Sequence, residues 1–243
     1  SDRDWSSDVC SSDLELLRLY RLASSQSKEE DAIREECRQE LVALQQGNAE
    51  NLEIWKECVR LSREGLQTIY ERIKVSFDHW LGESSYNDRL ADVVESLEEA
   101  GLARESDGAI CVFSDESLAP KIDPFKIQRE GEWEDKPMIV RKSDGGFNYA
   151  TTDIATIDYR VEEFGADCAW YVVDHRQGDH FKQLFSVAQR RGHKLALEHI
   201  SFGTILGKNG KPLKTREGDL PLLSDLLRDA VQAARESSEG RTR

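Results

Sequence analysis

Apolar residues recur at helical spacing through residues 15–74. In the stretch 50–73 these positions are Leu52, Trp55, Val59, Leu61, Leu66, Ile69 and Ile73. A return every three or four residues predicts long amphipathic helices. Gly47 is expected to end one helix and Asn48 or Asn51 to cap the next, because glycine favours helix ends and asparagine side chains accept from N-terminal amides. The same spacing predicts a helix over 88–102 that closes at Gly101.

The pattern then shifts towards strands. Residues 108–116 alternate and predict a short strand, whereas 118–137 is a polar, proline-containing connector. From Pro137 onwards strands and helices are expected to alternate: strands 138–142, 168–174 and 195–203, helices 151–165 and 178–192. The continuously apolar run 168–174 is typical of a parallel strand buried on both faces. This βαβαβ order predicts an α/β fold with a doubly wound parallel sheet and flanking helices.

Composition excludes some classes of protein. The chain has 243 residues, a net charge of -14 and no apolar run near the ~20 residues of a membrane span. No secretory signal is visible and the five cysteines are scattered, so we expect reduced thiols in a cytoplasmic protein. Residues 138–216 contain 12 lysines and arginines against 9 aspartates and glutamates. This local positive charge suits a phosphate-handling site, although ordinary variation in surface charge explains it equally well.

Three polar, glycine-containing loops follow the predicted strands, where open parallel sheets bind ligands. The third loop carries four cations around a tight Asn209–Gly210 turn: Lys208, Lys211, Lys214 and Arg216. Such charges could stabilise phosphate oxygens during catalysis. The loop lacks the spacing of a Walker A motif, and a solvated hairpin is the alternative interpretation.

The first loop leads to Tyr149 and Asp153, one helical turn apart. Asp153 is either a carboxylate that favours a helix start or an acid that binds a cation. In the second loop, Gln177 can both donate and accept hydrogen bonds, which suits an amino-acid head group. His180 is either a helix-start histidine or part of the same site. None of these residues is decisive singly.

Residues 4–14, "DWSSDVCSSDL", stand apart from the rest. They back-translate naturally to a string typical of a sequencing-library adaptor, and helical periodicity begins directly after them. We expect residues 1–14 to be an artefact, with a genuine polar tail as the alternative.

Four segments together resemble the class I arginyl-tRNA synthetases: "VSFDHWLGESSYNDRL", "KSDGGFNYATTDIATIDYR", "WYVVDHRQGDHFKQLF" and "HISFGTILGKNGKPLKTREG". They follow the family's order and spacing, and the resemblance covers residues 15–235. It implies a Rossmann-like class I core with a mainly helical insertion. Residues 15–135 would be the insertion, and 136–243 the second half of the nucleotide-binding fold.

The resemblance also implies roles for single residues. Asp153 would pair with the guanidinium of arginine, which its carboxylate can accept bidentately, while Tyr149 and Gln177 contact the amino acid. His180, Gly203 and Thr204 would lie near ATP.

Segment "LKTREG" occupies the place of the KMSKS loop without spelling it, which leaves open which cation acts on pyrophosphate. Lys214 and Arg216 rank first, then Lys208 and Lys211. No metal-binding residue is identified. The family implies ATP as a substrate, Mg²⁺, tRNA(Arg) and a monomer.

No HIGH-type motif occurs in the sequence. We therefore expect a fragment that is inactive alone, from a parent that activates arginine with ATP and transfers it to tRNA(Arg). Two alternatives remain: a synthetase-like binding module without catalysis, and a related nucleotidyl-transfer enzyme with another substrate.

Overall fold

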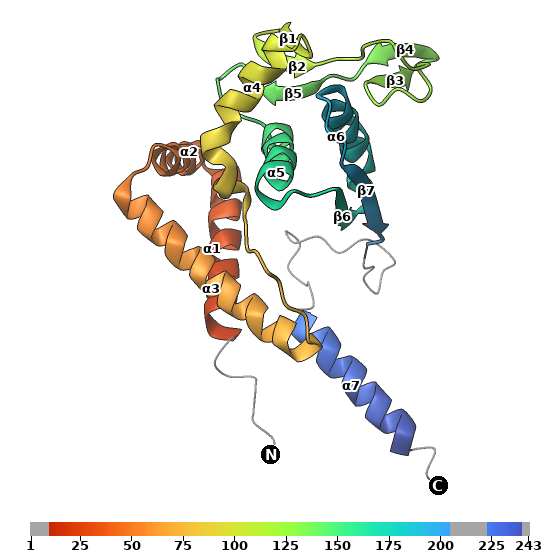
Figure 1. Ribbon diagram of the computed structural model, residues 1–243. Helices are drawn as coiled ribbons and strands as arrows, with labels where there is room; N and C mark the ends of the chain where they lie inside the picture. The colour runs from red at the N-terminus through yellow and green to blue at the C-terminus, as the bar shows by residue number, and fades with distance from the viewer. Residues whose placement is uncertain (1–9, 205–222, 240–243) are drawn as a thin grey trace. The chain divides into compact units, whose positions relative to one another are not determined.

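The computed structural model describes residues 10–204 and 223–239, which belong to two compact units (Figure 1). Of the described elements, one unit holds α1 to α3 and α7, and the other holds everything from η1 to β7. The division after Asp78 follows packing, whereas the expected boundary at 135/136 follows a change of sequence pattern. The assignment of 15–135 as an insertion therefore stays a prediction.

The first unit is helical, with α1 (Cys10–Glu29), α2 (Asp31–Gln45), α3 (Ala49–Ile73) and α7 (Leu223–Glu239). Helices α1, α2 and α3 pack against one another. The side chain of Asn48 accepts from the N–H groups of Glu50 and Asn51, which confirms the predicted cap of α3. None of the described helices is both long and apolar enough to cross a bilayer.

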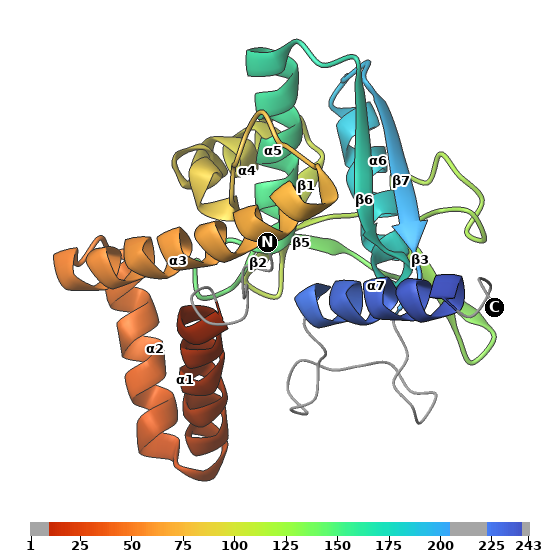
Figure 2. The same ribbon diagram turned by 90° about the horizontal axis from the view of Figure 1, so that it is seen from below.

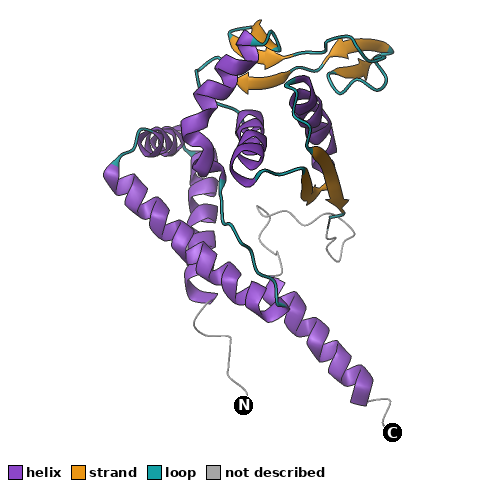
Figure 3. Cartoon of the chain, viewed as in Figure 1, coloured by secondary structure: helices purple, strands orange, loops and turns teal. Residues whose placement is uncertain are grey.

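The second unit mixes helices and strands (Figure 3). Its helical elements are η1 (Glu83–Arg89), α4 (Leu90–Glu99), α5 (Tyr149–Phe164), η2 (His175–Gln177) and α6 (Gly178–Arg190). Its strands are β1 (Ala103–Ser106), β2 (Ala109–Val112), β3 (Lys126–Arg129), β4 (Glu132–Asp135), β5 (Met138–Arg141), β6 (Cys168–Asp174) and β7 (Ala196–Phe202). The mixed α/β class is therefore confirmed.

The sheet arrangement differs from the predicted one. Strands β6 and β7 pair in parallel, as expected, but β5 joins an antiparallel sheet in the order β1-β2-β5. The polar connector is not structureless, because it forms the antiparallel hairpin β3–β4. Its turn residues Glu130 and Gly131 both have positive φ, the geometry of a type I′ turn. Since the hairpin returns the chain beside β2, β5 pairs there without a crossover helix.

Among the described residues, the side chains of β6 are shielded from solvent on one face and exposed on the other. Tyr171 is buried, whereas Trp170 and Val172 are 68% and 64% exposed. Ile200 on β7 lies opposite Val172 and is exposed as well. The prediction that β6 is buried on both faces is wrong for the described residues of this unit, because α6 packs on one side of the two-stranded sheet and the side chains on the other side are exposed. Figure 2 shows α6 beside β6 and β7.

Helix α5 is central to the core of the second unit. It packs against α4, α6 and β5, and buries Ile154, Ala155 and Ile157. The Thr151 hydroxyl donates to the Val140 carbonyl at 2.5 Å, which ties the first turn of α5 to β5. Gly165 ends the helix with φ +58, as predicted from a residue that adopts left-handed backbone at little cost.

Candidate functional site

Tyr149, Asp153 and His180 meet where the start of α5 faces the start of α6. Nε2 of His180 lies 2.6 Å from Oδ2 of Asp153. The rings of Tyr149 and His180 meet edge to face, with centroids 4.8 Å apart. The phenol is exposed, whereas the Asp153 side chain is 34% and the His180 side chain 11% exposed. The result is a carboxylate with an aromatic neighbour and access to solvent.

The local sequence explains why these side chains share one face. Helix α5 begins at Tyr149, two residues earlier than predicted, because the Asn148 side chain accepts from the Tyr149 N–H and caps it. Tyr149 and Asp153 are then separated by one turn of a helix. Packing of α5 on α6 brings His180 to them, so helix packing and not the edge of a shared sheet assembles this part of the site.

The negative charge of Asp153 also acts on the core beneath it. Burial raises the pKa of Tyr171 to about 12; the Arg160 guanidinium opposes this rise and the Asp153 charge adds to it. Arg160 lies over the Tyr171 ring, 4.9 Å from its centroid. Within the described chain, the Tyr171 hydroxyl makes no hydrogen bond of normal geometry.

A second cluster lies at the carboxyl ends of β6 and β7. Asp174 and Phe202 are register partners, so the loops that follow them leave from one sheet edge, as predicted. The Asp174 carboxylate accepts from the Arg176 side chain and backbone, and from the Thr204 hydroxyl at 3.2 Å. These Arg176 bonds, side chain first, hold the pKa of Asp174 well below its usual range.

Sequence reasoning missed Asp174. Its signal was available, since an acid that ends an apolar strand and precedes a glycine-containing loop stands at a ligand-binding edge. Thr204 was predicted to lie near ATP, and that role stays a prediction; in the structure its hydroxyl donates to the Asp174 carboxylate.

The other predicted residues are less closely gathered. Gln177 is exposed at the N-cap of α6, and among the described side chains no hydrogen bond joins it to Tyr149 or Asp153. Gly203 follows β7, and a Cβ added there would meet nothing within 4 Å. The four cations Lys208, Lys211, Lys214 and Arg216 lie outside the described residues. Across 10–204 and 223–239, no three His, Cys, Asp or Glu side chains are grouped to hold a metal ion.

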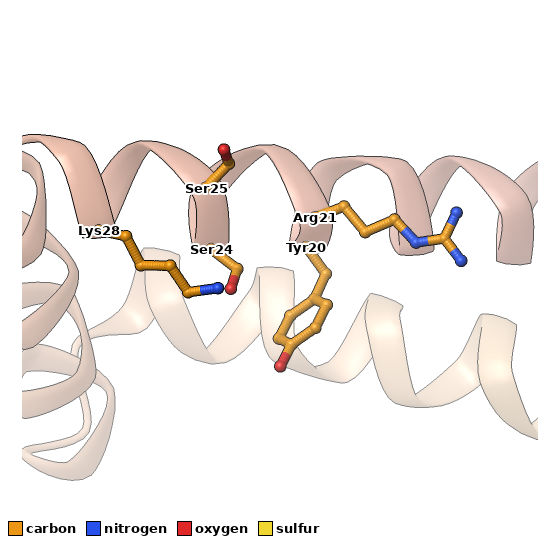
Figure 4. A pocket seen from close by; sticks show the side chains of 5 residues that line it. All are labelled: Tyr20, Arg21, Ser24, Ser25 and Lys28. Carbon is orange, nitrogen blue, oxygen red and sulfur yellow. The ribbon is translucent and has the colours of Figure 1, made fainter. Parts of the chain in front are cut away.

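A small pocket also occurs on α1 (Figure 4). Its volume is about 140 Å³, and it is lined by Tyr20, Arg21, Ser24, Ser25 and Lys28. All five belong to one helix, so the pocket lacks the converging elements typical of a ligand site. None of the predicted site residues lines it, and the candidate site remains at α5 and α6.

Comparison with known proteins agrees with this architecture. Two solved arginyl-tRNA synthetases share the fold of the chain. The match to the Plasmodium falciparum structure covers 87% of this chain and 33% of that protein, with a TM-score of 0.66 at 22% identity. The match to the Thermus thermophilus structure covers 88% of this chain and 38% of that protein, with a TM-score of 0.62 at 18% identity. At these identities the likeness defines a class I synthetase-like fold and nothing finer.

Sequence similarity narrows the class. The profile described as "tRNA synthetases class I (R), catalytic domain" matches residues 6–242. An arginine–tRNA ligase of Rhodopirellula baltica is 45% identical over 230 residues, and one of Nostoc sp. is 42% identical over 230 residues. These alignments cover 94% and 93% of the chain. The chain belongs to the catalytic-domain family of the class I arginyl-tRNA synthetases. It spans 31% and 37% of the length of these two relatives.

Proposed function

We propose that the protein to which this chain belongs activates arginine with ATP and transfers it to tRNA(Arg). The observation that carries the proposal is the partly exposed Asp153 carboxylate beside Tyr149 and His180. An anionic, partly desolvated group suits a guanidinium, which offers paired donors in a plane. A neutral amino-acid side chain would leave this carboxylate without a charge partner.

In the proposed reaction, a carboxylate oxygen of arginine attacks the α-phosphorus of ATP and pyrophosphate leaves. The arginyl-adenylate then reacts with a hydroxyl of the terminal adenosine of tRNA, which releases AMP. Asp153 would hold the guanidinium, Tyr149 would line the amino-acid site, and Gln177 would contact the head group. The backbone near Gly203 and Thr204 would lie against adenine.

Negative charge develops on the pyrophosphate as it leaves, and cationic side chains can stabilise it. Lys214 and Arg216, with Lys208 and Lys211, are proposed to stabilise the departing pyrophosphate. Among the described residues no three His, Cys, Asp or Glu side chains are grouped to hold Mg²⁺. In phosphoryl transfer Mg²⁺ is commonly bound through substrate phosphates. The ATP role predicted for His180 stays a prediction, since its observed partner is Asp153.

The experiment is steady-state kinetics of the full-length protein, with arginine and ATP varied separately. Asp153→Asn keeps the size of the side chain and removes its charge, so kcat/KM for arginine should fall on the order of a hundredfold while the KM for ATP stays unchanged. Lys214→Ala should slow adenylate formation and leave the KM for arginine unchanged.

Glu162→Gln is the matched control, because Glu162 lies on the same helix and pairs with Arg89 at the surface. It should leave both KM values unchanged. Wild-type arginine kinetics in Asp153→Asn would reduce Asp153 to a helix-start carboxylate and defeat the proposal.

The 243-residue polypeptide alone is proposed to lack arginine activation. Its sequence contains no HIGH-type motif, and it spans about a third of its relatives. Pyrophosphate exchange measured with this polypeptide and tRNA should stay at background, and exchange at the rate of the full-length protein would contradict this.

A further inference from the structure

His180 is the observed hydrogen-bond partner of the carboxylate proposed to receive arginine. Its Nε2 lies 2.6 Å from Oδ2 of Asp153. Within the described residues no hydrogen bond reaches the other carboxylate oxygen, Oδ1. An ionised carboxylate only accepts, so Nε2 of His180 carries the proton of this bond. One oxygen is therefore held from the protein side while the other stays available.

The imidazole is itself fixed in place. It lies in the first turn of α6, next to the buried Phe181, and its ring is 5.3 Å from the Phe181 ring. Phe181 packs in turn against His199 on β7, with ring centroids 4.7 Å apart, and against Tyr171 on β6. The rings of His180 and Tyr149 also contact each other in an edge-to-face arrangement. Because two aromatic rings contact the imidazole, its orientation is restricted and its Nε2 has a defined direction.

A carboxylate with one fixed bond has a restricted orientation. Two oxygens offer about four lone-pair directions in total, and one bond from a fixed donor leaves the rest pointing in known directions. Recognition sites gain affinity when the contacting group is held in position by a second, well-packed group. A mobile aspartate, by contrast, would lose rotamer freedom each time it bound a ligand.

We propose that His180 is a positioning residue for arginine recognition, which holds Asp153 through Oδ2 so that Oδ1 faces the guanidinium. The inference rests on the proposed function and adds a residue to the same site. His180 need not touch arginine, because its effect passes through Asp153.

Two substitutions in the full-length protein separate the hydrogen bond from the packing. His180→Phe keeps an aromatic ring against Tyr149 and Phe181 and removes the donor. His180→Gln keeps an N–H donor at similar reach and removes the ring. We expect His180→Phe to raise the KM for arginine about tenfold with little change in kcat or in the KM for ATP. His180→Gln should restore the KM for arginine to within about threefold of wild type.

Three outcomes would overturn the positioning role. Equal losses in both variants, accompanied by equal drops in melting temperature, would make His180 a structural residue. A lower KM for arginine in His180→Phe would show that the imidazole competes with the substrate for Asp153. An unchanged KM in His180→Phe would show that the bond has no effect on recognition.

Asp153→Asn distinguishes failure of this inference from failure of the proposed function. If Asp153→Asn raises the KM for arginine and His180→Phe does not, only the positioning role fails. If Asp153→Asn leaves arginine kinetics unchanged, the proposed substrate site itself fails. In the double variant, the added effect of His180→Phe should be less than about twofold, because the two residues act through one contact.

Discussion

Two regions of this chain have similar hydrophobic patterns and very different burial. Helix α4 places Leu90, Val93, Val94 and Leu97 in the core of the second unit. Helix α3 is longer and also amphipathic, yet among its described residues only Gly65 is buried. Ile54, Trp55, Val59, Leu66 and Ile73 on α3 remain exposed. Periodicity thus shows which face of a helix is apolar, whereas burial requires another element to cover that face.

Ion pairs also differ in burial between the two units. In the second unit Asp158 is buried and accepts from Arg191 at 2.6 Å and 2.8 Å, and it lies 2.8 Å from Nε2 of His193. In α3, Arg60 instead pairs with Glu57 and Glu64 along one exposed helix face. Removing one partner of a buried ion pair leaves an unpaired buried charge, which is strongly destabilising. Removing one partner of an exposed pair costs little, because water solvates the remaining charge.

The largest expected effect comes from a matched pair of leucines. Leu184 on α6 is 0% exposed, so Leu184→Ala should destabilise its unit by about 3–4 kcal/mol through lost contacts and a cavity. Leu66 on α3 is 42% exposed, and Leu66→Ala should cost less than about 1 kcal/mol. Hydrogen exchange of the amides of α6 in Leu184→Ala and of α3 in Leu66→Ala measures the loss of stability in each variant. Similar costs would mean that the two units are equally well packed.

Breaking the buried ion cluster should have the next largest effect. Asp158→Asn leaves the Arg191 guanidinium without its charge partner, at a cost of about 3 kcal/mol. Urea unfolding monitored by circular dichroism would measure this change. Glu57→Gln in α3 is the control and should leave the midpoint unchanged, because both partners of its pair are exposed. A larger shift in the control than in Asp158→Asn would reverse the comparison.

An alkaline effect should be confined to the second unit. The pKa of Tyr171 is raised by burial to about 12, from about 10 in an unfolded chain. The folded state then keeps a proton on Tyr171 that the unfolded state loses. The stabilisation linked to Tyr171 is therefore full below pH 10, and it falls by up to ~3 kcal/mol as the pH rises to 12. Stability measured against pH should show this slope in wild type.

Tyr171→Phe should remove the contribution of Tyr171 to that slope. At pH 7 it should be neutral or slightly stabilising, because the hydroxyl is buried without a normal hydrogen bond among the described residues. An unchanged slope in Tyr171→Phe would assign the alkaline loss to other groups.

The smallest expected effect on stability comes from removing the asparagine caps of α3 and α5. Asn48→Ala should remove two hydrogen bonds to the start of α3 and cost about 1 kcal/mol, seen as faster exchange in its first turn. Asn148→Ala removes one bond from α5, where Thr151 also anchors the first turn to β5. Its effect on exchange should be smaller. A larger effect at α5 would show that the Thr151 anchor contributes little.

Local structure was the most predictable part of this fold. The Asn48 cap, the Gly165 stop and the shared face of Tyr149 and Asp153 all depend on residues within a few positions of one another. Propensity and spacing are sufficient for such features. The β3–β4 hairpin was missed, although Gly131 marked its turn, because each face of the hairpin carries a single apolar residue, Ile127 or Trp133, among polar ones.

Long-range pairing was less predictable. Strand β5 has the composition of a strand in a parallel sheet, but it pairs with β2 in an antiparallel sheet. The spacing of apolar residues indicates a strand and does not indicate which strand it pairs with. The contact between Asp153 and His180 joins residues 27 positions apart, and it depends on how α5 packs against α6. Sequence reasoning named both residues but assigned them to different ligands. The roles of all the site residues stay predictions.

The hairpin β3–β4 has a consequence for how this fold can vary. Val112 and Met138 are direct partners across β2 and β5, so segment 113–137 leaves and rejoins the sheet at neighbouring points. Such a segment can change length during evolution at little cost, since a fourfold shortening saves only about 1.2 kcal/mol of closure entropy. Phe125 sets the limit, because its ring is buried and Arg190 of α6 lies 5.5 Å from its centroid. The length of the hairpin tip can therefore change at little cost to stability, provided that the buried Phe125 ring is kept.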